Sequence, residues 1–169
     1  MQKESIRMSH DSDVTGEIKV VVFDLGDRVF AIRIDYVREI LEHRDPTVVP
    51  DEPSWLAGIL ELSEAVLPVV SLHRRFGAEE RDTRRHLIHL TTPEGDMIFT
   101  ADDVTAIRMV TPDQIKSVDK FGEQEGAHFL EGAVSLDGDL VLIIDPRRVV
   151  DMKVLQEAQD KAPIGEGVE

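Results

Sequence analysis

The sequence predicts a mainly all-β protein made of two small, related β-barrels, and two repeated stretches carry this prediction. Residues 56–72 form a hairpin-like pattern that returns at residues 130–145, with glycines and apolar residues in matching places. Residues 30–40 can likewise be aligned with residues 97–107. Two copies are too few for a solenoid or a propeller, so the repeat favours a pseudo-symmetric pair of barrels.

The composition predicts a soluble protein of one domain, or of two small ones that share a core. Of the 169 residues, 41% are hydrophobic, and the net charge is −15. This acid excess argues against nucleic acid or an anionic membrane as partner, because binding either one depends on basic residues. Cysteine is absent, which excludes disulfides and thiol chemistry. Residues 1–17 lack a signal-peptide pattern and no apolar run reaches about 20 residues, so we expect a cytoplasmic protein.

In the first half, residues 18–25 are rich in β-branched side chains and predict a strand. Gly26 and Asp27 predict a tight turn, which leads into a second strand over residues 28–33. Apolar residues then recur with helical spacing over residues 34–41, which predicts one or two helical turns. A connector with three prolines follows, at Pro46, Pro50 and Pro53.

Residues 72–76 predict a short helical turn after the first repeated hairpin. Residues 77–85 are charged and predict a solvated linker between the two halves. The second half begins with strands over residues 86–91 and 97–100, joined by a turn at residues 93–95. By the internal repeat, we expect a helical turn and a connector to follow, as in the first half.

Toward the end of the chain, residues 117–128 predict a polar loop before the second repeated hairpin. The Asp137-Gly138 pair in that hairpin favours a tight turn, because such turns require φ > 0. Asp145 and Pro146 then form a helix-start signal, an acidic cap followed by proline at the first helical position. We expect this helix to run to about residue 161.

The sequence contains no phosphate-binding loop, no nucleophile elbow and no zinc-binding helix motif. His86 and His89 have a spacing that suits a metal pair only on a helix, whereas a strand turns them to opposite sides. Asp102 and Asp103 could be a paired carboxylate, but a solvated turn with a helical cap is the simpler interpretation.

A basic cluster stands out in this acidic chain. Acidic residues between the arginines largely cancel its charge, so a charged loop is a simpler interpretation than a docking patch. The cluster consists of Arg74, Arg75, Arg81, Arg84 and Arg85.

The order and spacing of six motifs resemble the CheW family, the coupling proteins of bacterial chemosensory arrays. The likeness extends over about residues 18–150. The motifs are residues 22–26 (Val-Phe-Asp-Leu-Gly), 34–40 (Ile-Asp-Tyr-Val-Arg-Glu-Ile), 55–59 (Trp-Leu-Ala-Gly-Ile), 66–70 (Val-Leu-Pro-Val-Val), 103–104 (Asp-Val) and 129–138 (Phe-Leu-Glu-Gly-Ala-Val-Ser-Leu-Asp-Gly).

This resemblance implies two SH3-like five-stranded β-barrel subdomains, related by a pseudo-two-fold axis around a shared apolar interior, with short helical turns and a C-terminal helix. It implies one domain over residues 18–152, a flexible tail over 1–17, and the end of the helix and a tail over 153–169. It also implies a scaffold with no catalysis and no cofactor. Such a scaffold links a CheA-type histidine kinase to the cytoplasmic tip of methyl-accepting chemoreceptors, at arrays beneath the inner membrane, and can pair with other CheW-like proteins.

Carried over by position, the family's receptor or kinase contacts fall on Val37 and Glu39, with Ile34 and Ile40 as apolar neighbours. The alternative for both isoleucines is core packing. Gly58 matches a functionally sensitive family glycine, and the alternative is a backbone geometry that a Cβ forbids.

The chain departs from the family at the tip of the first repeated hairpin. The family usually has Asn-Leu-Arg-Gly where this chain has Glu61-Leu62-Ser63-Glu64. Ser63 therefore replaces an arginine that is associated with partner binding. The guanidinium of arginine can donate two parallel hydrogen bonds to one carboxylate, which a serine hydroxyl cannot do. Glu64 replaces the turn glycine, so we expect a turn type that avoids φ > 0 at Glu64. The usual aspartate at position 71 is serine here. We predict the family fold with an altered, more acidic partner surface.

Three functions remain open on the sequence. The leading one is an adaptor between kinase and receptor. The second is a divergent regulator that binds the kinase, or another chemosensory protein, without coupling receptors. The third is a small enzyme, which the lack of converging polar residues disfavours.

Overall fold

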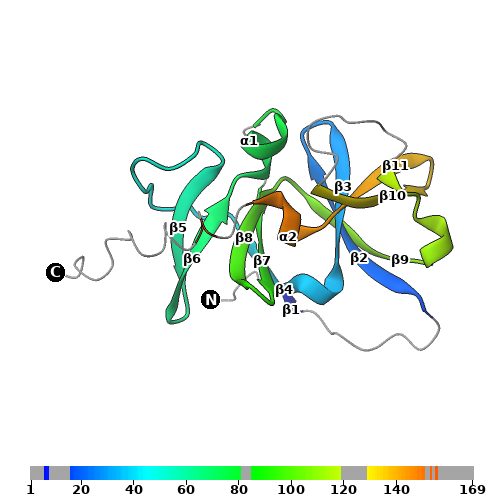
Figure 1. Cartoon of the computed structure of the whole chain (residues 1–169), viewed down its shortest axis with the longest axis horizontal. Helices are drawn as coiled ribbons and strands as arrows, with labels where there is room; N and C mark the ends of the chain where they lie inside the picture. The colour runs from blue at the N-terminus through cyan, green and yellow to red at the C-terminus, as the bar shows by residue number, and fades with distance from the viewer. Residues whose placement is uncertain are drawn as a thin grey trace.

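The computed structural model describes residues 16–80, 85–118, 129–150, 153 and 155, and the backbone of residues 6–7. Its strands form two sheets (Figure 1). The first, called barrel 1, has the order β1(Ile6–Arg7), β4(Val37–Glu42), β7(His86–Thr92), β8(Gly95–Ala101), β6(Ala65–Val70), β5(Leu56–Leu62). The second, called barrel 2, has the order β10(Leu130–Leu136), β11(Asp139–Ile144), β3(Arg28–Arg33), β2(Ile18–Leu25), β9(Val104–Val110). This confirms the predicted pair of barrels. Strand β1 lies in the stretch predicted as a tail.

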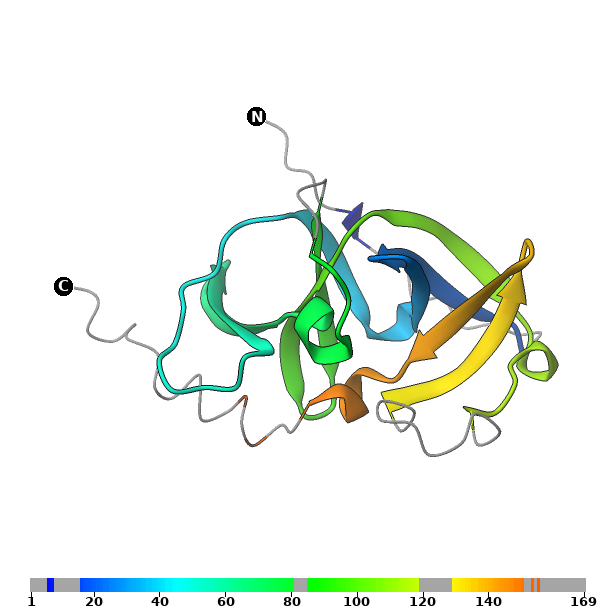
Figure 2. The same ribbon diagram turned by 90° about the horizontal axis from the view of Figure 1, so that it is seen from above.

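Each barrel contains strands from both halves of the sequence (Figures 1 and 2). The β2–β3 hairpin of the first half belongs to barrel 2, and the β7–β8 hairpin of the second half belongs to barrel 1. Two parallel pairings, β3 with β11 and β6 with β8, join the exchanged hairpins to their barrels. The repeat in the sequence is therefore real, but one copy does not make one barrel.

The internal repeat extends to irregularities in strand pairing. The β4–β7 register skips Arg38, and the β2–β9 register skips the matching residue, Thr105. The β5–β6 register skips Ala57, and the β10–β11 register skips its counterpart Glu131. These bulges add one residue to one strand and turn the following side chains to the other face.

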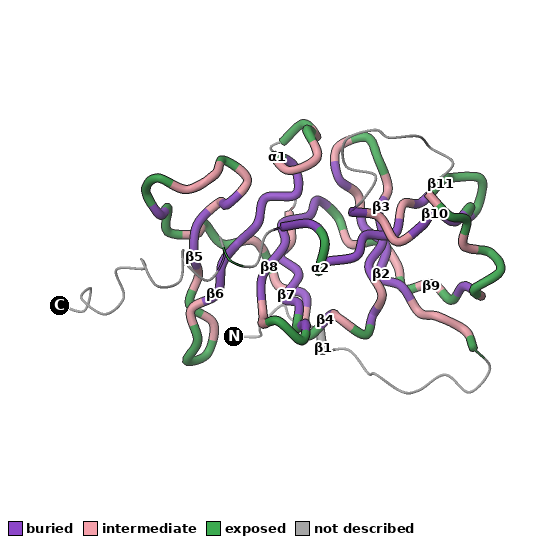
Figure 3. The backbone as a smooth tube through the Cα atoms, viewed as in Figure 1, coloured by how far each residue is buried: buried purple, intermediate pink, exposed green. Residues whose placement is uncertain are grey.

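The largest hydrophobic core lies between the barrels, as predicted (Figure 3). Stacked rings run through it: the centroids of Phe23 and Phe30 are 6.2 Å apart, and those of Phe30 and Phe76 are 5.4 Å apart. A smaller cluster fills each barrel, around Val69 and Ile98 in barrel 1 and around Val20 and Ile143 in barrel 2. The two barrels therefore form one packed body.

Residues 34–41 differ from the prediction of one or two helical turns. They form a single 3-10 turn, η1(Ile34–Tyr36), followed directly by β4. Val37 and Ile40 would face opposite sides of a regular strand, but the bulge at Arg38 turns both into the core. Because of the bulge, buried residues three positions apart occur in a strand, a spacing that is otherwise typical of a helix. In the second half no helical turn follows β8; residues 102–103 bend directly into β9, and the 3-10 turn η2(Pro112–Gln114) comes after it.

Two short helices occupy matching places after the repeated hairpins. Helix α1(Leu72–Phe76), at the predicted bounds, is capped by the Ser71 hydroxyl, and α2(Pro146–Val149) by the Asp145 carboxylate, as expected. The prediction of one continuous helix is wrong at Val150, which is extended (φ −137°, ψ 161°) and ends α2. Lys153 and Leu155 are helical again, and the rest of the predicted helix lies outside the described residues.

Asp102 is not the solvated turn residue that the sequence indicated. Its side chain is buried, 3.0 Å from His73 Nε2, and it accepts a 2.7 Å hydrogen bond from the backbone N–H of Gly26. His73 follows β6 of barrel 1, whereas Gly26 is in the β2–β3 turn of barrel 2. The carboxylate therefore ties the two barrels together, and only the neighbouring Asp103 is exposed.

The turn between β5 and β6 predicts a stabilising substitution. Ser63 has a positive φ of 56°, whereas Glu64 is not among the residues with positive φ, as expected for that position. We expect Ser63→Gly to raise the free energy of unfolding by about 1 kcal/mol, because a non-glycine residue is strained there. The matched variant Glu64→Gly should lower it by roughly 0.5 kcal/mol through a more flexible unfolded chain. Urea unfolding measures both, and equal effects of the two variants would contradict this turn geometry.

Asp145 predicts a dependence of stability on pH. Burial alone would raise the pKa of this carboxyl, but hydrogen bonds from Arg147 and the charges of Arg147 and Arg148 hold it below its ordinary value. A depressed pKa stabilises the fold above the unfolded pKa, and this contribution is lost as pH falls through the folded pKa. We expect Asp145→Asn, which keeps the cap, to lose less stability than the parent between about pH 6 and about pH 3. Urea midpoints at both pH values test this, and parallel losses would refute it.

Candidate partner-binding surface

Four of the predicted contact residues lie inside the molecule. Ile34, Val37 and Ile40 have exposed fractions of 6%, 0% and 5% and belong to the core between the barrels. The structure supports core packing as their role. Gly58 is also buried; a Cβ there would come within 2.7 Å of the carbonyl carbon of Thr47, and its φ is +151°. Its backbone geometry alone therefore accounts for the glycine.

The other four predicted residues are accessible at one end of barrel 1. Glu61, Ser63 and Glu64 are exposed at the end of β5 and in the turn after it, and Glu39 is half-buried on β4. The guanidinium of Arg44 donates a hydrogen bond to the backbone carbonyl of Glu61 at 3.2 Å. This end of the barrel therefore presents acidic and hydroxyl groups to the surface.

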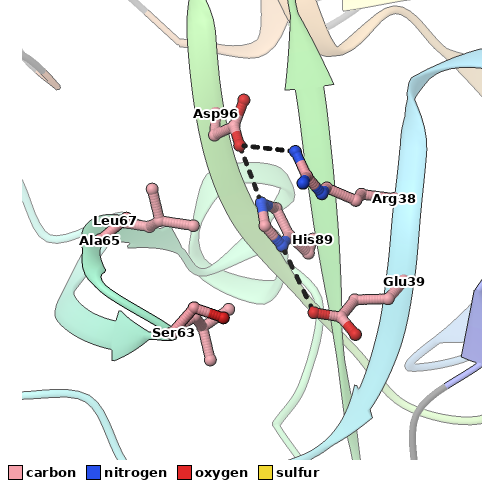
Figure 4. A pocket seen from close by; sticks show the side chains of 8 residues that line it. Arg38, Glu39, Ser63, Ala65, Leu67, His89 and Asp96 are labelled. Atoms are coloured by element: carbon pink, nitrogen blue, oxygen red, sulfur yellow. Dashed lines mark hydrogen bonds and ion pairs between the residues drawn. The ribbon is translucent and has the colours of Figure 1, made fainter.

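A pocket of about 180 Å³ opens at this end of barrel 1 and brings Glu39 and Ser63 together (Figure 4). Glu61 and Glu64 do not line it. The lining residues come from five strands, β4 to β8, and from the β5–β6 turn: Arg38, Glu39, Leu62, Ser63, Ala65, Leu67, His89 and Asp96. Figure 4 shows the charged side chains on one wall, with Ser63, Ala65 and Leu67 on the opposite one.

His89 is at the centre of the charged wall. Its side chain is only 8% exposed, and its Nε2–H donates to Asp96 Oδ2 at 3.0 Å, since a carboxylate can only accept. Its other ring nitrogen, Nδ1, is 3.7 Å from Glu39 Oε2 and has no hydrogen-bond partner. Arg38 is at the rim, 64% exposed, with Nη1 3.9 Å from Asp96 Oδ2. His89 and Asp96 were not among the predicted site residues.

Sequence reasoning also missed an apolar strip on β9, formed by Ile107 and Met109. These side chains are 51% and 55% exposed. Ile107 pairs directly with Val21, which belongs to the core between the barrels, so both leave the sheet on the face turned to that core. The strip is thus an exposed apolar part of the same sheet face that carries Val21. Alternation along residues 104–110 was the available signal, but these residues were assigned in part to a helical turn.

The basic cluster has structural contacts rather than a free surface. Arg75 stacks 4.1 Å from the Phe129 ring centroid, and its Nε–H donates to the Val149 carbonyl at 2.8 Å. Arg74 bonds the Ser54 carbonyl and pairs with Glu80. Both arginines support the α1 region between the barrels (Figure 1), and Arg81 and Arg84 lie outside the described residues.

His86 and His89 lie on one strand, as predicted, but with separate partners, since His86 Nδ1 is 3.0 Å from the Asp102 carbonyl. Among the residues described, no group of three or more potential ligands could hold a metal ion. None of the helices in that same part of the chain is long and apolar enough to span a membrane.

Comparison with known proteins gives a consistent result. The family model of the CheW-like domain matches residues 19–154. A probable chemotaxis protein CheW of Rhizobium etli is 28% identical over 132 residues, covering 77% of this chain and 85% of that protein. The chemotaxis protein CheW of Thermotoga maritima is 24% identical over 150 residues, covering 86% and 96%.

A solved structure shares the fold. The crystal structure of the scaffolding protein TtCheW from Thermoanaerobacter tengcongensis matches with a TM-score of 0.73 at 21% identity, covering 86% of this chain and 94% of that one. The two-barrel arrangement is therefore common to both molecules.

Proposed function

The chain belongs to the CheW family, and from this premise we propose that it is a non-enzymatic scaffold that couples a CheA-type histidine kinase to the cytoplasmic tip of methyl-accepting chemoreceptors. The observation that carries the proposal is that one packed body offers two chemically different surfaces. One is the apolar strip of β9, and the other is the polar end of barrel 1. A coupling protein needs two such surfaces at once.

The receptor tip is the proposed partner of the apolar strip. A helical hairpin presents apolar side chains along one face, and such a face packs into apolar grooves of its partner. Ile107 and Met109 offer a matching apolar row on the face of the barrel 2 sheet that also carries Val21. The cytoplasmic location follows from the same proposal, because the receptor tip is there.

The kinase is the proposed partner of the polar end of barrel 1. Glu39, Glu61 and Glu64 give this end acidic side chains, with Ser63 between them. The acidic character favours a kinase surface with basic groups, since complementary charge sets partner choice more than affinity.

Titration of the full chain with a kinase regulatory domain, and separately with a receptor-tip fragment, tests the proposal. We expect Ile107→Glu with Met109→Glu to weaken receptor binding at least about tenfold, or roughly 1.4 kcal/mol, and to leave kinase binding unchanged. Leu140→Glu is the matched control, because Leu140 is 56% exposed on β11, a different strand.

The outcomes separate the alternatives. Binding of both partners, with loss of receptor binding only in the β9 variant, supports a coupler. Binding of the kinase alone supports the divergent regulator instead. Binding of neither would refute both.

A further inference from the structure

We infer that the pocket at the end of barrel 1 binds an arginine side chain presented by a partner protein. The inference rests on the proposed function only in naming a protein as the source of the arginine. The pocket itself is defined by Glu39, Ser63, His89 and Asp96.

The geometry of His89 leaves a hydrogen-bond donor missing. Nε2 carries the hydrogen that is donated to Asp96, so in the tautomer with this single ring hydrogen Nδ1 is an acceptor. It faces a second acceptor, Glu39 Oε2, at 3.7 Å. Nδ1 is buried without a partner, which costs free energy as long as no donor reaches it. A ligand with N–H groups would satisfy both acceptors together.

Comparison with barrel 2 shows that the fold does not require this polar cluster. The β2–β9 pair Val22 and Ala106 occupies the place of His89 and Glu39 in the β7–β4 pair, and both pairs adjoin the same bulge. Val29 similarly occupies the place of Asp96. Barrel 2 has apolar side chains at these positions, so the fold of such a barrel does not require the charges found in barrel 1.

A guanidinium is the cation that fits best. It has five N–H donors in a planar fork, which can reach a carboxylate and a neighbouring acceptor at the same time. The short side chain of Ser63 leaves the cavity of about 180 Å³ open on the opposite wall. The chain's own Arg38 does not fill the pocket, because its side chain is 64% exposed at the rim and 3.9 Å from Asp96.

The test is an NMR titration of the full chain with N-acetyl-arginine amide, observing the imidazole signals of His89. N-acetyl-citrulline amide, which has the same shape without the charge, is the matched ligand control. We expect saturating shifts at His89 with the arginine compound and none with citrulline. Glu39→Gln should reduce the binding constant at least fivefold, and Glu64→Gln, an exposed carboxylate outside the pocket, should not change it.

Each other outcome overturns the inference. Equal shifts with citrulline would mean that charge is not recognised. Shifts that persist in Glu39→Gln would mean unspecific attraction to an acidic protein. Saturation by N-acetyl-lysine amide at the same concentration would show a general cation site rather than a guanidinium site. Because neither kinase nor receptor is present, the result is independent of the coupling experiment. The backbone amide spectrum of each variant verifies that it is folded.

Discussion

Gly58→Ala is expected to lower the free energy of unfolding by about 3 kcal/mol, the sum of two separate costs. At φ +151° an alanine is strained, and its Cβ would collide with the carbonyl group of Thr47. Thr47 and Ile59 exchange two backbone hydrogen bonds at this point, of 2.9 and 2.8 Å, so the connector cannot move away without losing them. Urea unfolding monitored by circular dichroism measures the effect.

Two other glycines separate the two costs. Gly138→Ala adds a Cβ in open space at φ +87°, so only the backbone strain of about 1 kcal/mol is expected. Gly132 is the counterpart of Gly58 in the second repeat. A Cβ there would lie 2.5 Å from Cγ2 of Ile115 and 2.8 Å from the Lys116 carbonyl oxygen, so Gly132→Ala should cost about 1–2 kcal/mol through overpacking. If Gly58→Ala lowers the free energy of unfolding by no more than Gly138→Ala does, the connector at Thr47 has moved to make room for the Cβ.

Asp102→Ala should destabilise the protein by about 3 kcal/mol, because it leaves two donors without an acceptor, one of them on the buried His73. These are the Gly26 N–H and the Nε2 of His73, which come from different barrels. Unfolding in urea gives the total loss. Hydrogen exchange at the Gly26 amide reports the lost bond directly, and its protection should fall more than that of amides in β5 or β10.

Asp103→Ala is the matched control for Asp102→Ala. Its side chain is exposed one residue further along, so the change should be within about 0.5 kcal/mol. Asp102→Asn keeps one acceptor oxygen and should fall between the two. If Asp102→Ala behaves like Asp103→Ala, the carboxylate does not hold the barrels together.

The hairpins and the repeat could be predicted from sequence because their signals are local. A run of β-branched residues, the repeated apolar pattern and the turn residues predict β2–β3 and β10–β11, and the Asp137-Gly138 turn has positive φ at both residues. Features that depend on contacts between distant parts of the chain could not be predicted from these local signals. A bulge at Arg38 imitated a helical period, and the burial of Asp102 depends on a turn 76 residues away.

The candidate site was predicted only in part, for a similar reason. The resemblance to the family drew attention to Glu39 and Ser63, which the fold does bring into one pocket. It did not indicate His89 or Asp96, because their chemistry appears only when β4, β7 and β8 are side by side. Ile34, Val37 and Ile40 were selected by position, although their burial depends on the complete core.

The exchange of hairpins between the barrels has a consequence for how the chain acquires its structure during synthesis. Barrel 1 is incomplete until β8 has left the ribosome, and the β2–β3 hairpin of barrel 2 waits for β9 and β11. Contacts between strands that are distant in the sequence slow folding, because the chain loses the entropy of loop closure before strand pairing stabilises it. Neither half of the sequence contains all the strands of one barrel. We therefore expect the two halves to reach their native structure together, late in synthesis.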